Sequence, residues 1–253
     1  MSTERTVVDR LWPEVAAALD DAGILAAYAP EPGAPWLRMN FVTSLDGAAT
    51  RDGRSGGLGD AADRRIFELL RRQADAVLIG AGTVRDEGYG AMRLSPEAAA
   101  WRTTAGLAPQ PVLALVSRGL DLDPRSPVFA DAPVRPIVYT GAGSSATRRD
   151  ALGAVADVVV AGAEGDDGVD PARVRRHLET RGLLGVHAEG GPSIFGAFHA
   201  AGAVDELCLT IAPTVEAGRA PRIATSPEAA PAGMRLVGLL RAGDELFVRY
   251  RRA

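Results

Sequence analysis

Cysteine is almost absent from the sequence: Cys208 is the one cysteine among 253 residues. A single thiol excludes an internal disulfide bond and any metal site built from several cysteines. Long apolar runs are missing too, so no segment reaches the roughly 18 apolar residues that a membrane-spanning helix needs. The N-terminus lacks the apolar core of a signal peptide. These absences lead us to expect a cytoplasmic protein without membrane contact.

No large excess of either charge sign marks the chain. It has 28 basic and 32 acidic residues, which gives a formal net charge of -4. No basic run long enough to form a nucleic-acid-binding face occurs. The terminal arginines Arg249, Arg251 and Arg252 alternate with Tyr250, as at the end of a strand. The charge pattern therefore excludes a nucleic-acid-binding protein.

Short apolar runs alternate with helical patterns, which predicts an α/β fold. The helix expected over 60–73 begins at the capping residue Asp60, and the one over 171–181 begins at Asp170 and stops at Gly182; a third is expected over 194–201. Strands are predicted over residues 36–44, 76–80, 112–116, 136–140, 157–161, 183–188, 204–211, 236–241 and 245–250. We expect a mixed, mostly parallel sheet with helices on both faces. The turn at 242–244 predicts a C-terminal antiparallel hairpin at one edge of the sheet.

The first 35 residues have a different pattern of apolar residues. Apolar residues recur at helical spacing over residues 5–20, which predicts a short amphipathic helix that starts near Pro13. We therefore expect residues 1–35 to form an N-terminal helix and connector, and residues 36–253 to form the main domain. The Pro- and Ala-rich stretch 217–233 is predicted to be an irregular loop.

The clearest chemical motif is Glu189-Gly190-Gly191-Pro192-Ser193-Ile194-Phe195-Gly196, between a predicted strand and a predicted helix. Its glycines permit close backbone approach, and the free N–H groups of a helix N-terminus bind phosphate. Since ligands of α/β sheets bind at the carboxyl ends of strands, Glu189 is expected to face the same crevice. The alternative is a tight strand-to-helix turn with an incidental glutamate.

Three further motifs follow predicted strands or open a helix. The stretch 80–89 contains Gly-Ala-Gly-Thr-Val followed by two acids and Tyr89, and would seat a ribose or diphosphate unless it is a surface loop. Residues 40–47 end a strand in Ser-Leu-Asp-Gly. Residues 52–60 form a glycine-rich loop, but neither a phosphate-binding loop with Gly-Lys-Ser/Thr nor a Gly-x-Gly-x-x-Gly turn is present.

In this order, the four motifs and the segment Asp205–Pro213 resemble the riboflavin-biosynthesis pyrimidine reductase family, from about Trp36 to the C-terminus. The resemblance implies a dihydrofolate-reductase-like fold, a homodimer, NADPH as hydride donor, and a ribosylamino-pyrimidine phosphate whose ribose is reduced to a ribityl chain. It implies substrate contacts by Ser55, Glu189, Asn40 and Arg93. The implied cofactor contacts are Val42, Thr83, Glu87, Ser117 and the turn of Gly190, Gly191, Pro192, Ser193, Ile194 and Phe195. Arg118 is expected to contact the cofactor because it follows Ser117 at a predicted strand end.

Departures from the family pattern leave the substrate open. Asn40 stands where many bacterial members have lysine, and Gly57 replaces a tryptophan. The substrate is expected to be 5-amino-6-(5-phosphoribosylamino)uracil or its 2,5-diamino-pyrimidinone precursor. Dihydrofolate is the alternative substrate. A catalytically inactive NADPH-binding regulatory module is an alternative of another class, and a flavin-binding reductase is a third with little support.

Within the reductase hypothesis, Glu189 orients the substrate and is the candidate to relay a proton. Either Arg118 or Arg85 reads the 2′-phosphate of NADPH. The family's bifunctional members also carry a zinc deaminase, whose His-x-Glu element is mimicked by His187-Ala188-Glu189. Because one cysteine cannot complete such a site, no metal is expected.

Overall fold

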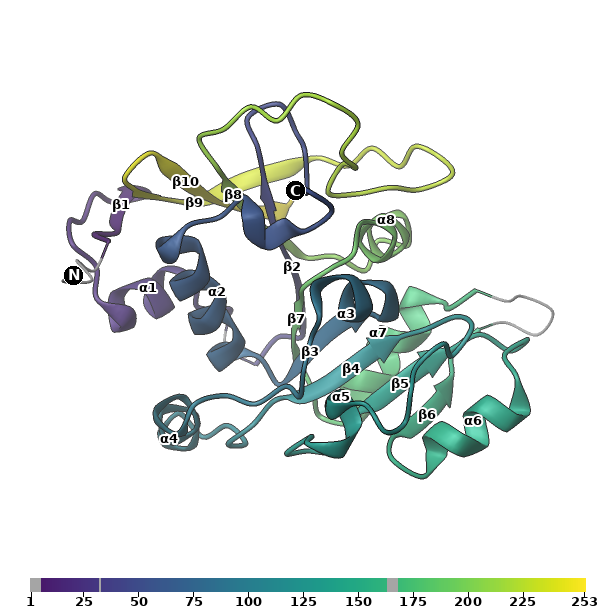
Figure 1. The fold of residues 1–253 in the computed structure, drawn as a ribbon. Helices are drawn as coiled ribbons and strands as arrows, with labels where there is room; N and C mark the ends of the chain where they lie inside the picture. The colour runs from purple at the N-terminus through teal and green to yellow at the C-terminus, as the bar shows by residue number, and fades with distance from the viewer. Residues whose placement is uncertain (1–5, 32, 163–167) are drawn as a thin grey trace.

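A sheet of ten strands runs through the chain (Figure 1). It is seen in a computed structural model that describes residues 6–31, 33–162 and 168–253. The strand order is β1-β9-β10-β8-β2-β7-β3-β4-β5-β6. The strands are β1 (Asp9–Trp12), β2 (Trp36–Thr43), β3 (Ala76–Gly80), β4 (Val112–Val116), β5 (Ile137–Thr140), β6 (Asp157–Val160), β7 (Gly185–Ala188), β8 (Glu206–Ile211), β9 (Met234–Ala242) and β10 (Glu245–Arg252).

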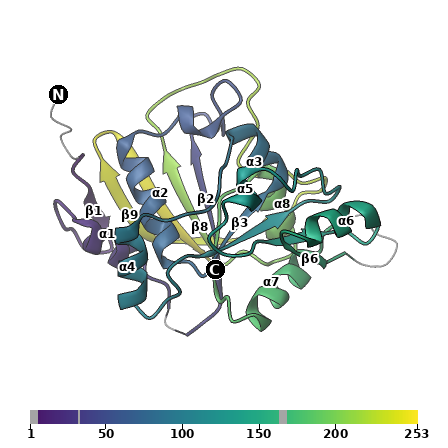
Figure 2. The same cartoon turned by 60° about the horizontal axis from the view of Figure 1, so that its bottom comes forward.

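The sheet is parallel from β8 to β6 and antiparallel from β8 to β1. β2 pairs in parallel with both β8 and β7, and β7 leads through β3 and β4 to β5 and β6. β10 pairs antiparallel with β8 and β9. Figure 2 shows β1 and β9 at one end of the molecule and β6 with α6 at the other. The expected mostly parallel α/β sheet with a C-terminal hairpin is confirmed.

The central strands are apolar along their whole length because both faces of the sheet are covered. All five residues of β3 are buried, as are four of the five in β4. The predicted bounds of these two strands agree with the structure residue for residue. Burial on both faces therefore accounts for continuous apolar runs rather than alternating ones.

Helices cover both faces of the sheet, as predicted. Val174 of α7 and Phe198 of α8 pack on one face, whereas Val84 of α3 and Leu152 of α6 pack on the other. The Asp60 and Asp170 side chains accept hydrogen bonds from backbone N–H groups in the first turns of α2 and α7. The helices are α1 (Asp21–Ala27), α2 (Ala61–Gln73), α3 (Ala81–Glu87), α4 (Pro96–Thr104), α5 (Pro127–Ala130), α6 (Ala146–Gly153), α7 (Pro171–Thr180) and α8 (Pro192–Ala200), with a 3₁₀ turn η1 (Ser55–Gly57).

The predicted N-terminal helix over 5–20 is wrong. Residues Asp9–Trp12 form β1, which pairs antiparallel with β9, and the first helix is α1, which is capped by Asp20. The apolar residues do not share a helical face, since Val8 is fully buried while Val15 is 82% exposed. The open edge of β9 offers backbone partners to a Val-containing segment, and strand pairing prevails over local periodicity. The C-terminal hairpin consequently does not end the sheet, because β1 covers it.

A buried charge cluster ties α1 and its following residues to the sheet. Glu206 accepts from Arg38 at 2.5 Å and pairs with Arg249 at 2.7 Å and Arg251 at 3.3 Å. Arg38 and Arg249 also donate to backbone carbonyls of Tyr28, Ala27 and Ala29, which end the first helical segment. Burial by itself would raise the pKa of the Glu206 carboxyl, but Arg38 and Arg249 outweigh it and hold that pKa at about 2.

The long loop 212–233, called the β8–β9 loop below, lies next to the loop after β2 and the start of α8 (Figure 1). It has no regular structure, as predicted. Its backbone hydrogen-bonds to Leu45 and Ala49 of the loop after β2, and Thr225 donates to Pro192 of α8. The loop packs so closely on α8 that a Cβ at Gly196 would lie 1.8 Å from a loop carbonyl oxygen.

Candidate active site

The four sequence motifs meet at one edge of the sheet. Three of them end or follow β2, β7 and β3, which are neighbouring parallel strands, so their carboxyl ends lie side by side. The fourth, the loop 52–60 before α2, reaches the end of α3 through a hydrogen bond between Ser55 and Glu87. The Gly80 N–H donates to the Gly190 carbonyl at 2.8 Å, and the Glu189 N–H donates to the Leu78 carbonyl at 2.9 Å. The motifs at 80–89 and 189–196 are therefore in direct contact, as the strand-end argument predicts.

Two helix N-termini open at this edge with glycine caps. α3 begins after Gly80 and α8 after Gly191, and within the described residues no side chain caps either helix. Their first backbone N–H groups and positive dipole ends consequently face the same crevice. The alternative of a surface loop at 80–89 is wrong for most of this stretch, because Ala81–Glu87 form the helix α3.

The glycine pair allows close packing at the entry to α8. Gly190 has a φ of +116°, which side-chain-bearing residues rarely adopt, and the Gly190–Gly191 peptide is cis. A Cβ at Gly191 would lie 2.7 Å from the Thr83 hydroxyl oxygen. Only a residue without a side chain leaves the space between this turn and α3 open.

Glu189 is held by residues from two other segments. Its carboxylate accepts two hydrogen bonds from the Arg71 guanidinium, from Nε at 2.5 Å and Nη2 at 2.7 Å, and a third from the Tyr89 hydroxyl at 3.0 Å. The Arg71 guanidinium lies over the Phe67 ring, 4.3 Å from its centroid. The Glu189 side chain is fully buried in this arrangement. The carboxylate is thus fixed in orientation at the end of β7.

The charges of the cluster balance. Burial works against the charged form of Arg71, but Glu189 outweighs it and raises the pKa of that guanidinium. Burial, reinforced by Glu189, raises the pKa of Tyr89 well above its usual value, so its hydroxyl stays protonated. His187 lies 3.6 Å from Glu189, yet burial, with Arg38 and Arg71 nearby, holds its pKa well below the usual range. His187 is therefore neutral, and within the part of the chain that the structure describes Arg71 supplies the one positive charge paired with the carboxylate.

The glycine-rich loop joins the site through a backbone contact. The Ser55 N–H donates to the Glu87 carboxylate at 2.8 Å, which links the 52–60 loop to the end of α3. Asn40 is half-buried on β2, next to β8. Val42 is only 9% exposed and packs with Leu58, so its side chain faces the core.

The arginines expected at the site are in different situations. Arg118 follows β4 with an exposed side chain, next to the buried Ser117. Arg85 donates to the Asp121 carbonyl at 2.9 Å. Arg93 is exposed, and it donates to the Asp131 carbonyl at 2.8 Å instead of contacting the Glu189 cluster.

Sequence reasoning missed Arg71 and gave Tyr89 no role. Arg71 lies in the last turn of α2, where a basic residue is ordinary. No spacing rule links it to Glu189, which is 118 positions away. The available signal is indirect: a buried strand-end glutamate requires a cation, and α2 is the helix that reaches it.

The described residues contain neither a metal-binding cluster nor a membrane-spanning helix. No group of three or more His, Cys, Asp or Glu side chains in that part of the chain is placed to hold a metal ion. No helix in residues 6–31, 33–162 or 168–253 has the length and apolar character to cross a membrane.

Comparison with known proteins supports the resemblance. The 2,5-diamino-6-ribosylamino-4(3H)-pyrimidinone 5′-phosphate reductase of Methanothermobacter thermautotrophicus is 30% identical over 223 residues, which cover 85% of this chain and 97% of that protein. The riboflavin biosynthesis protein RibD of Bacillus amyloliquefaciens is 29% identical over 74% of this chain but only 47% of its own length. This chain spans about half the length of such RibD proteins.

A solved structure gives the same result. A pyrimidine reductase-like protein from Corynebacterium diphtheriae superposes with a TM-score of 0.78 at 31% identity, covering 87% of this chain and 92% of that one. The sequence profile of the RibD C-terminal domain matches residues 35–248. With most of its length matched in sequence and in fold, the chain belongs to the RibD C-terminal domain family.

Proposed function

We propose that the chain is an NADPH-dependent reductase that converts the ribosyl chain of a ribosylamino-pyrimidine 5′-phosphate to the ribityl form in riboflavin biosynthesis. The observation that carries this proposal is the meeting of the α3 and α8 N-termini with the buried Glu189–Arg71–Tyr89 cluster at one strand edge. Anion-binding backbone next to a fixed polar cluster suits a phosphorylated cofactor and a polar substrate. The matched relatives that carry reductase names support the same conclusion.

The residues at the edge fit a dinucleotide. The N–H groups at the start of α8 would bind a phosphate, and the Thr83 hydroxyl, which a Cβ at Gly191 would meet, borders the same space. NADPH supplies a hydride when it is bound. The task of the chain is to hold cofactor and substrate in position and to keep water out of the crevice.

Glu189 has an orienting role in this proposal. Arg71 and Tyr89 supply three donors to its two oxygens, so the carboxylate accepts hydrogen bonds in this structure and is fixed in direction. A carboxylate with remaining lone pairs can accept further bonds from substrate hydroxyl or amine groups. Ser55, Asn40 and Arg93 stay predictions as substrate contacts.

Turnover of purified protein with NADPH is the direct test. The three candidate substrates are 5-amino-6-(5-phosphoribosylamino)uracil, its 2,5-diamino-pyrimidinone precursor and dihydrofolate. Each is offered separately, and the loss of NADPH absorbance is followed. The proposal is supported if either pyrimidine is reduced faster than dihydrofolate. The pyrimidine with the higher turnover is then the substrate. Dihydrofolate as the best substrate would replace it with a dihydrofolate reductase, and NADPH binding without turnover would indicate a regulatory module.

Glu189→Gln tests the orienting role in the same assay. Because the amide replaces one acceptor oxygen by a donor, we expect turnover to fall by about tenfold to a hundredfold with NADPH affinity retained. Glu179→Gln, at a half-buried position of α7 that pairs with Arg175, is the matched control and should keep wild-type kinetics. Normal turnover of Glu189→Gln would remove this residue from the mechanism.

Arg118 is the better candidate to read the 2′-phosphate. Its side chain is exposed at the end of β4, while Arg85 is engaged with Asp121. Arg118→Ala is expected to lower NADPH affinity and leave NADH affinity unchanged, with Arg85→Ala as the control. Unchanged NADPH affinity in Arg118→Ala would exclude it.

The homodimer and the cytoplasmic location belong to the same proposal. Sedimentation at micromolar concentration tests the first, and cell fractionation tests the second. A monomer under these conditions would contradict the expected assembly.

A further inference from the structure

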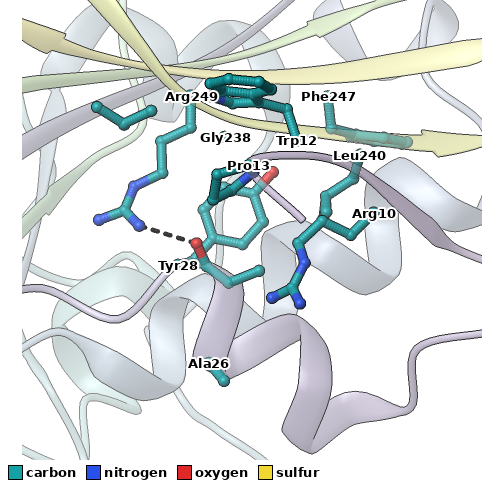
Figure 3. A pocket seen from close by; sticks show the side chains of 11 residues that line it. Arg10, Trp12, Pro13, Ala26, Tyr28, Gly238, Leu240, Phe247 and Arg249 are labelled. Atoms are coloured by element: carbon teal, nitrogen blue, oxygen red, sulfur yellow. Dashed lines mark hydrogen bonds between the residues drawn. The ribbon is translucent and has the colours of Figure 1, made fainter. Parts of the chain in front are cut away.

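A second cavity lies away from the strand ends described above. Its volume is about 220 Å³, and it is bordered by β1, the end of α1, β9 and β10 (Figure 3). Arg249 of β10 lines it. In the sheet, Arg249 lies opposite Cys208 of β8, and Cys208 lies opposite Asn40 of β2. A strand therefore separates this cavity from the proposed reductase site.

The walls of the cavity are largely aromatic and aliphatic. Trp12, Tyr28 and Phe247 contribute rings, and Leu240 and Val237 contribute aliphatic surface. Trp12 is 51% exposed, an unusual exposure for so large an apolar side chain. Such walls suit the flat apolar body of a small molecule. The volume is below that of pockets for drug-sized ligands, which favours a single ring.

Two cations line the same cavity, and none of its eleven described lining residues is acidic. Arg10 and Arg249 lie on opposite sides of the Tyr28 ring in Figure 3. Arg249 donates through its Nη atoms to Ala27 and Ala29, but its buried Nε has no hydrogen-bond partner among the described residues. A buried donor without an acceptor is costly and rare, so an acceptor is expected there when a ligand binds.

The charge around Arg249 is unbalanced as well. Glu206 is shared among Arg38, Arg249 and Arg251, and among the described residues the one further carboxylate in that cluster is Glu31, on Arg251. Three guanidinium groups thus face two carboxylates. Arg10 adds another positive charge at the cavity, where its Nε donates to a backbone carbonyl. The excess favours an anion over a neutral or cationic ligand.

We propose that this cavity is a binding site for a single-ring aromatic carboxylate, with its ring against Trp12, Tyr28 and Phe247 and its carboxylate toward the Nε of Arg249, while Arg10 adds to the positive charge of the cavity. The site is independent of the proposed reductase function.

Calorimetric titration of the full chain with benzoate tests the proposal, with benzamide as the uncharged analogue. Benzoate is expected to bind about tenfold more tightly than benzamide, the equivalent of one charge-assisted hydrogen bond. Saturating NADPH should not displace it. Equal affinity for the two probes, no saturable binding of benzoate, or displacement by NADPH would overturn the proposal.

Variants locate the binding. Arg10→Gln and Trp12→Ala alter partly exposed lining residues and leave the buried Glu206 cluster intact, so the chain should fold. Each should weaken benzoate binding by about fivefold or more. Arg241→Gln is the matched control, since Arg241 lies on β9 outside the cavity and pairs with Asp9. Equal binding by Arg10→Gln, Trp12→Ala and the control would contradict the proposed site.

Discussion

Replacing Glu206 by glutamine removes the one carboxylate shared by Arg38, Arg249 and Arg251. In the folded chain the pKa of this carboxyl is about 2, against an ordinary value of 4.5. A depressed folded-state pKa means that the ionised carboxylate stabilises the fold above the unfolded-state pKa. That contribution is lost as the pH falls from about 5 toward 2. It amounts to about 3 kcal/mol at pH 7 and about 1 kcal/mol at pH 3.

Urea unfolding of wild type and Glu206→Gln at both pH values measures these differences. We expect the variant to lose about 3 kcal/mol at pH 7, because the buried guanidinium groups of Arg38 and Arg249 and the half-buried one of Arg251 lose their shared counter-charge. Glu179→Gln provides the control: its partner Arg175 lies four residues earlier on α7, and the loss should be about 0.5 kcal/mol or less. A Glu206→Gln loss no larger than the control, or one that does not shrink at pH 3, would refute the reasoning.

Three further perturbations follow from described contacts. Gly196→Ala should lift the β8–β9 loop off α8 and speed its tryptic cleavage, whereas Gly153→Ala, whose methyl meets open space, should not; equal cleavage would contradict the packing. Burial, with Asp60 adjacent, raises the pKa of Glu245 to about 8, so wild type should lose stability as the pH rises from 4.5 to 8. Urea midpoints of Glu245→Gln should decline less over that range, and parallel curves would argue against the shift. Arg102→Met removes the buried guanidinium that donates to backbone carbonyls at the end of α2, and should cost about 2–4 kcal/mol in urea unfolding; a loss below about 1 kcal/mol would show that those carbonyls find other donors.

Much of the fold could be predicted from the sequence because its central strands are buried on both faces. Such strands appear as uninterrupted apolar runs, and turn residues bound them on either side. The N-caps Asp60 and Asp170 could also be predicted, since each accepts hydrogen bonds within its own helix. These signals are local, and no distant part of the chain overrides them.

The sequence-based predictions fail where contacts between distant parts of the chain determine the structure. Residues 9–12 have apolar spacing compatible with a helix, but their partner is β9, more than two hundred residues later in the chain. Similarly, nothing near Arg71 indicates that it pairs with Glu189. The strand-end position of Glu189 was predictable, because parallel strands share a carboxyl edge. The identity of its partner depends on how α2 crosses the sheet, which sequence patterns do not specify.

The place of β2 in the sheet has a consequence for how the chain is made. β2 is synthesised early, yet the strands on its two sides, β7 and β8, are synthesised much later. Glu206, the ion-pair partner of Arg38, comes 168 positions after it in the chain. β3, β4, β5 and β6 are neighbours in sequence order and can pair as they leave the ribosome. Through most of synthesis β2 therefore has two unpaired edges, each able to bind another nascent chain. The strand at the centre of the finished molecule is thus open to wrong pairing on both edges while the molecule is being built.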